Sequence, residues 1–122
     1  MAVTIQSFGL NESPQIVSES DLTGTPVRDI SGGVAGVVNA IEIDNSANGA
    51  ATYFKGYDNG APTVGTTDPD LVIMIPASVR RTVIFIDGFD FDSAFSFAGV
   101  TTGGTGGTTS PTSDAPAEVV AS

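Results

Sequence analysis

Phenylalanine follows a two-residue alternation between residues 83 and 97. Val83 and five phenylalanines occupy odd positions in this stretch, namely Phe85, Phe89, Phe91, Phe95 and Phe97. Because successive side chains of a β-strand point to opposite faces of the sheet, the spacing predicts one strand with its aromatic rings on one face. The opposite face takes Asp90, Asp92, Ala94 and Ser96. One apolar face and one polar face are typical of antiparallel sheets packed on a single core.

Further strand candidates recur along the chain, separated by turn residues. A turn is expected at residues 45–49 (Asn-Ser-Ala-Asn-Gly), between a strand that begins near Val37 and a strand over 51–58. A helical turn over 34–40 remains an alternative, because the valines there also fit helical spacing. The other strand candidates are 3–8, 16–22, 71–75 and 118–121. Asp87-Gly88 is expected to be a turn or bulge within the phenylalanine strand, between 82–86 and 89–98.

The regular succession of strands and turns predicts an all-β fold, a β-sandwich with jelly-roll character. A chain of 122 residues suits one domain. We expect residues 34–98 to form the sandwich core. Residues 1–33 are expected to be an extended N-terminal arm with short strands. Residues 99–122 are expected to be a Gly/Thr/Ser/Pro-rich loop and a C-terminal strand, forming a second arm.

The chain is strongly acidic, with 14 acidic and 4 basic residues and a net charge of −10. Nucleic-acid binding depends on Lys and Arg that neutralise phosphates, so the composition predicts no nucleic-acid partner. Binding to an anionic membrane surface is disfavoured for the same reason. The longest apolar run, 71–76, is far shorter than the roughly 20 residues of a membrane-spanning helix.

The chain contains no histidine and no cysteine. The usual general base, the thiolate nucleophile and thiolate zinc ligands are therefore missing. A pair of carboxylates could hydrolyse a glycoside, which is the alternative for an enzyme. Most acidic residues lie at expected turns, where Asp bonds to the local backbone. We therefore predict that the protein is not an enzyme, with no catalytic residue and no cofactor.

Two groups of charged or aromatic residues are candidates for binding. Tyr53, Lys55 and Tyr57 alternate along a strand and are expected to form an exposed contact face, with packing within the sheet as the alternative. Arg80 and Arg81 lie at a turn and could extend that face by pairing with acids of a neighbouring subunit, or they could simply be solvated, which is the default.

Three neighbouring acidic residues, Asp87, Asp90 and Asp92, leave open a calcium site. The pattern of a calcium-binding EF-hand loop is absent, so a solvated face is the simpler interpretation. We therefore predict no metal site.

Residues 37–100 resemble a group of small virion proteins of tailed phages. The resemblance is carried by four segments: 41–51 (IEIDNSANGAA), 53–58 (YFKGYD), 61–66 (APTVGT) and 71–77 (LVIMIPA). A glycine-marked entry to a Phe-containing strand follows, as Gly88 and residues 89–97. Proteins of this group look like β-sandwich decoration (cement) proteins of the phage head.

The resemblance implies a structural protein on the outer capsid surface of a virion. Its partner would be the major capsid protein, and self-association as a homotrimer would match the threefold positions of the shell. The alternative is a tail, baseplate or fibre-associated module that binds a host surface. The acidity suits the outside of a shell, since the DNA inside would repel the chain.

Overall fold

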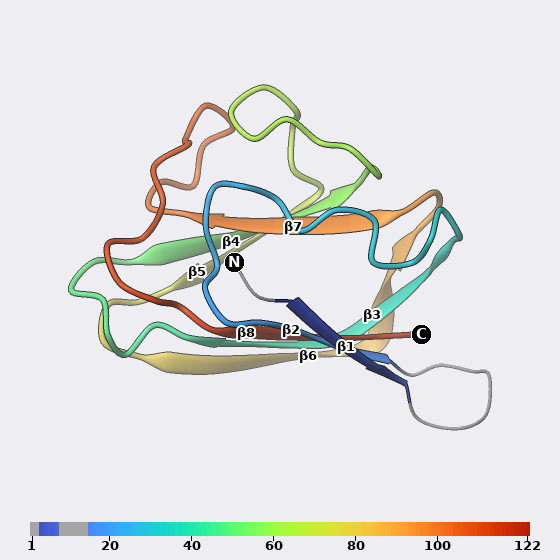
Figure 1. Ribbon diagram of the computed structural model, residues 1–122, viewed down its shortest axis with the longest axis horizontal. Helices are drawn as coiled ribbons and strands as arrows, with labels where there is room; N and C mark the ends of the chain where they lie inside the picture. Colours follow the sequence, from blue (N-terminus) through green and yellow to red (C-terminus); the bar gives the residue numbers. More distant parts are fainter. Residues whose placement is uncertain (1–2, 8–14) are drawn as a thin grey trace.

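The structure, a computed structural model, describes residues 3–7 and 15–122 and places eight β-strands there in two layers (Figure 1). The strands are β1 (Val3–Ser7), β2 (Gln15–Glu19), β3 (Gly36–Asp44), β4 (Thr52–Asp58), β5 (Leu71–Ile75), β6 (Arg80–Phe91), β7 (Phe95–Val100) and β8 (Ala117–Ala121). No helix in the described ranges has the length and apolarity needed to cross a membrane.

Both layers are antiparallel sheets. The larger sheet has the order β1-β2-β8-β3-β6, and the smaller sheet has the order β5-β4-β7. The predicted β-sandwich is thereby confirmed, and β3 is a strand and not the alternative helical turn. Jelly-roll character stays a prediction, because this strand order establishes only the two-layer sandwich.

Aromatic rings fill the space between the sheets. Phe54 of β4 stacks on Phe97 of β7 with ring centroids 5.4 Å apart, and Phe95 lies 5.5 Å from Phe91. Each fully buried ring contributes about 1.5–3 kcal/mol, and each ring pair adds roughly 0.5–1.5 kcal/mol. The alternating phenylalanines therefore hold the two sheets together.

The predicted single strand from 83 to 97 is in fact two strands in different sheets. β6 loses its regular pairing with β3 between Ile84 and Phe89, where Gly88 adopts a φ of 81°. The strand bends there and rises from the larger sheet toward the smaller one (Figure 1). Phe85 and Phe89 are only half-buried as a result.

The expected polar face opposite the phenylalanines is wrong for Ala94 and Ser96, which are buried. The Ser96 hydroxyl donates to the Asn59 carbonyl and accepts from the Asp29 N–H. Residues 22–30 run beside β7, where Val27 exchanges backbone hydrogen bonds with Phe97. Residues 22–30 therefore cover the edge of β7 and the side of β7 that carries Ser96, which the sequence pattern had predicted to be exposed.

The strand expected at 118–121 is present as β8, and it lies within the larger sheet and not on an arm. β8 pairs with β2 on one side and with β3 on the other, inside the larger sheet. Ala117, Val119 and Ala121 of β8 belong to the core. Such a short strand is stabilised by pairing on both sides, which its own sequence does not reveal. Most of residues 1–14 lie outside the described ranges.

Candidate functional site

The expected exposed stripe on β4 is covered. Lys55 and Tyr57 are fully buried, and Tyr53 is half-buried, so the prediction of an exposed face is wrong for the first two. The loops above the smaller sheet in Figure 1 come from residues 59–70 and 101–116. The Lys55 ammonium donates to the carbonyls of Gly104 and Gly107 in the second loop.

Glycine explains how the loop approaches β4 so closely. A Cβ atom on Gly103 would lie 2.9 Å from the ring of Tyr53, a distance that real Cβ atoms essentially never show. Burial lowers the pKa of Lys55 and raises the pKa of Tyr57. The Gly-Gly-Thr-Gly-Gly run is therefore a cover held by a buried lysine, whereas its composition had indicated a flexible loop.

Asp87, Asp90 and Asp92 are not gathered into one cluster. Asp90 lies opposite Val37 in the β3–β6 pair, and Asp92 follows the end of β6. Within residues 3–7 and 15–122, no cluster of three or more acidic side chains could hold a metal ion.

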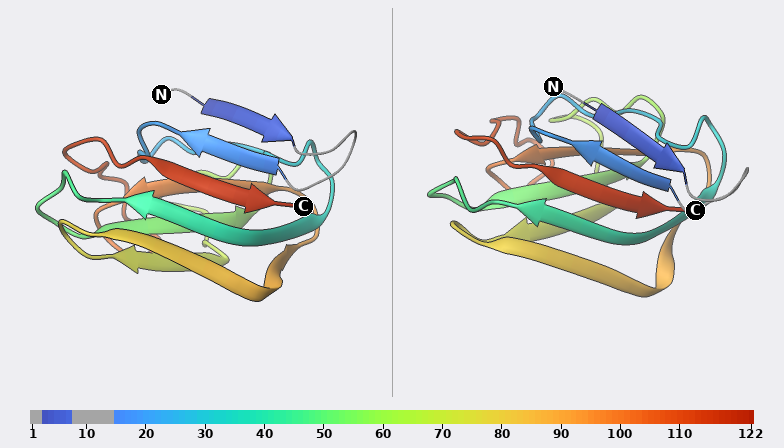
Figure 2. Two further views of the ribbon diagram at one scale, coloured as in Figure 1. Left: turned by 90° about the horizontal axis from the view of Figure 1, so that it is seen from below. Right: turned by 60° about the horizontal axis from the view of Figure 1, so that its bottom comes forward.

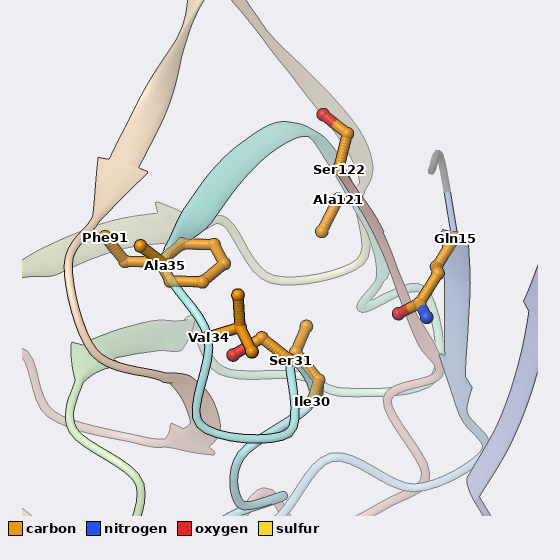
Figure 3. Close-up of a pocket in the computed structure, with 8 residues that line it drawn as sticks. All are labelled: Gln15, Ile30, Ser31, Val34, Ala35, Phe91, Ala121 and Ser122. Carbon is orange, nitrogen blue, oxygen red and sulfur yellow. The ribbon is translucent and has the colours of Figure 1, made fainter. Parts of the chain in front are cut away.

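A small pocket opens at one end of the sandwich (Figure 3). It is lined by Gln15, Ile30, Ser31, Val34, Ala35, Phe91, Ala121 and Ser122. Its volume of about 130 Å³ is below the roughly 300–1,000 Å³ of sites for small-molecule ligands. The buried Ser31 hydroxyl has no hydrogen-bond partner there, but the lining holds no acid or base for catalysis. The pocket therefore lacks both the volume and the acid or base groups expected of a catalytic site for a small molecule.

The outer face of the larger sheet is uncovered and carries a line of apolar side chains. In Figure 2 no described segment crosses in front of β2, β8, β3 or β6. Ile16 lies opposite Val120, Val120 opposite Ala40, and Ala40 opposite Ile84, in register across these four strands. We call these four residues the outer row. Ile84 is 72% exposed, and Ile86 beyond it on β6 is 95% exposed.

Polar side chains border the outer row on one side. Glu118 lies opposite Glu42, and both line an open groove of about 230 Å³ with members of the outer row. Glu42 accepts a hydrogen bond of 3.1 Å from the Thr82 hydroxyl and forms a 3.0 Å ion pair with Arg80. The hydrogen bond that Arg80 donates to the Glu42 carboxylate, together with the charge of that carboxylate, raises the pKa of Arg80. A flat apolar line with a charged border is chemically suited to a protein surface.

The two predicted arginines lie at the start of β6 and are exposed. Arg81 donates to the Met74 carbonyl of β5 at 2.8 Å. Sequence reasoning missed Ile16, Ile84, Ile86 and Val120 as surface residues. The available signal was the run from Val83 to Ile86, which is apolar at both odd and even positions.

Comparison with protein-family models, with curated proteins and with solved structures gives no match for this chain.

Proposed function

We propose that this protein is a phage capsid decoration (cement) protein that binds the outer surface of the head shell and stabilises it. The observation that carries the binding role is the uncovered outer row, which ends in the exposed Ile84 and the neighbouring Ile86. The resemblance of residues 37–100 supplies the partner, the major capsid protein.

The chemistry of the face supports binding and not catalysis. Aliphatic side chains bound to a partner would lose their contact with water, at about 25 cal/mol for each Å² of apolar surface covered. Glu42 and Glu118 at the border would select a partner surface that carries Lys or Arg. With a net charge of −10, the chain favours the outside of a DNA-filled particle.

The alternative role at the tail or on a fibre relied on Tyr53 and Tyr57 as an exposed binding face. Because Tyr57 is buried and Tyr53 is half-buried, the structure offers no observation in favour of that role.

Co-sedimentation with head shells that lack decoration protein tests the proposal. We expect the protein to sediment with shells assembled from the major capsid protein of the same phage, and Val120→Lys to weaken binding at least tenfold. Val72→Lys is the matched control, since Val72 is a 41% exposed valine on the other sheet and should bind normally. Absence of wild-type binding, or equal losses in both variants, would overturn the proposal.

A further inference from the structure

Strand β6 is the outermost strand of the larger sheet at the end opposite β1 (Figure 2). It pairs with β3 on one side, and no other described strand pairs with its second side. Its side chains alternate between half-buried and exposed from Val83 to Ile86. The free edge of β6 exposes a row of backbone donors and acceptors that another strand can pair with.

We propose that two copies of this chain associate through β6, paired antiparallel about a twofold axis at Ile84. In this register Ile84 faces its own copy, Val83 faces Phe85, and Thr82 faces Ile86. Side chains that are half-buried in one copy then meet half-buried side chains of the other, so the two sheets continue without a change of face.

The charges on β6 select this register. Arg81 falls opposite Asp87 of the second copy, and the symmetry creates this pair twice, once at each end. A twofold axis at Val83 would instead place Arg81 opposite Phe85. An axis at Phe85 would place Asp87 opposite Val83. Directly opposed residues of opposite charge stabilise a strand pair, whereas both alternatives set Arg81 against a phenylalanine. The axis at Phe85 would pair Arg80 with Asp90, but Asp90 lies beyond the bend at Gly88.

Charge also favours a second copy over an unrelated partner. Of the four basic residues, Lys55 and Arg28 are engaged with carbonyls of Gly104, Gly107 and Pro62. Arg80 and Arg81 lie at the start of β6, and Asp87 lies further along it, directly before Gly88. A strand that is basic at one end and acidic at the other is complementary to its own antiparallel copy. The Arg81 guanidinium has five N–H donors, so its bond to the Met74 carbonyl leaves donors that can reach Asp87 of the second copy.

Pairing would join the outer rows of the two copies. Ile84 of one copy lies against Ile84 of the other, so the line from Ile16 through Val120 and Ala40 continues across eight strands. This inference rests on the free edge and the charges of β6 and does not depend on the proposed binding to a head shell. It gives a dimer in place of the homotrimer that the resemblance implies.

Cysteine cross-linking tests both the association and its register, because the natural chain contains no cysteine. Ile84→Cys would bring two thiols face to face across the axis, with Cβ atoms about 4.5–5.5 Å apart. Ile86→Cys is the control: its two copies would be offset by four residues, roughly 14 Å. We expect a disulfide-linked dimer from Ile84→Cys and little from Ile86→Cys, although Ile86 is the more exposed residue. Faster linking through position 86, or none at either position, would overturn the register.

Charge reversal tests the paired ends. At about 0.15 M salt, where the net repulsion is screened beyond roughly 8 Å, light scattering should give twice the chain mass of 12.3 kDa. We expect Arg81→Asp and Asp87→Arg each to raise the dimer dissociation constant at least tenfold, and the double reversal to restore it to within about threefold of the natural protein. Arg80→Asp, with the same change in net charge as Arg81→Asp, should have little effect.

Thermal unfolding of each variant checks that it remains folded. A monomer or a trimer for the natural protein would overturn the proposal. A double reversal that stays as weak as its single reversals would overturn it as well.

Discussion

The carboxylate of Asp58 holds the turn through which the chain passes from one sheet to the other. Asp58 ends β4, and its two oxygens accept hydrogen bonds from the Asp92 N–H at 2.8 Å and the Ser93 N–H at 2.9 Å. The Ser93 hydroxyl adds a third bond at 3.0 Å. We predict that Asp58→Asn, which preserves size but replaces one acceptor oxygen with a donor, destabilises the protein.

The size of the effect follows from the lost acceptor and the lost charge. Hydrogen bonds to charged groups contribute about 1.5–3 kcal/mol, and the partial exposure of Asp58 argues for the lower part of that range. We therefore expect a loss of about 1.5–2 kcal/mol in the free energy of unfolding. For a domain of this size that corresponds to a fall in Tm of roughly 5–9 °C.

The effect should also depend on pH in a defined direction. The hydrogen bonds from the Asp92 and Ser93 N–H groups lower the pKa of Asp58 below its ordinary value of 3.8. The unfolded chain therefore takes up the proton first as pH falls. The stabilisation by Asp58 is complete above roughly pH 5 and is lost as pH falls through the folded-state pKa.

Urea unfolding of both proteins at pH 7 and at pH 3 measures this difference. Asp114→Asn is the matched control, since Asp114 is exposed and its substitution removes the same charge. A difference between natural protein and Asp58→Asn that stays constant down to pH 3 would refute the reasoning. An equal loss in Asp114→Asn would refute it too.

Two further substitutions test the core and the loop cover. Phe91→Asp should abolish cooperative unfolding measured by circular dichroism, because an unpaired buried charge costs several kcal/mol and Phe91 is only 3% exposed; Ile86→Asp in the same strand should stay folded, and a folded Phe91→Asp would contradict the core assignment. Lys55→Met should keep the packing of the stem but lose the bonds to the glycine carbonyls, so the Thr101 amide, which donates to the Thr109 carbonyl, should exchange hydrogen at least tenfold faster. An unchanged rate would contradict the role of Lys55 as the anchor of the loop.

The strands that sequence predicted best are those whose pattern is local. The apolar run Leu71–Ile75 is β5 without any change in bounds, and the turn at Asn45 precedes β4 as expected. Asn45 is buried and its amide donates to the carbonyls of Ala50 and Pro76, which explains why that turn is so well defined.

The alternation of odd and even positions did not reveal the break between β6 and β7. The turn at residues 92–94 contains three residues, so Phe91 and Phe95 keep odd numbers on either side of it. Side-chain alternation alone does not distinguish one long strand from two strands joined in this way. The cover over Lys55 was hidden for a different reason, because glycine and threonine carry no apolar pattern and the loop is held by backbone carbonyls.

A mismatch between the pattern of β6 and its surroundings points most directly to a missing partner. Strands that are covered on both faces are continuous apolar runs, and the stretch from Val83 to Ile86 is such a run. In the described structure only the inner side of that stretch is covered, so Ile84 and Ile86 lie in water. The outward residues of β5 are less exposed, with Met74 at 43%, although β5 is also an edge strand. Ile84 and Ile86 of β6 therefore leave larger fractions of their side chains in water than Met74 of β5 does. A partner strand is expected at β6 for this reason, and the charges of Arg81 and Asp87 complement a second copy of the same strand.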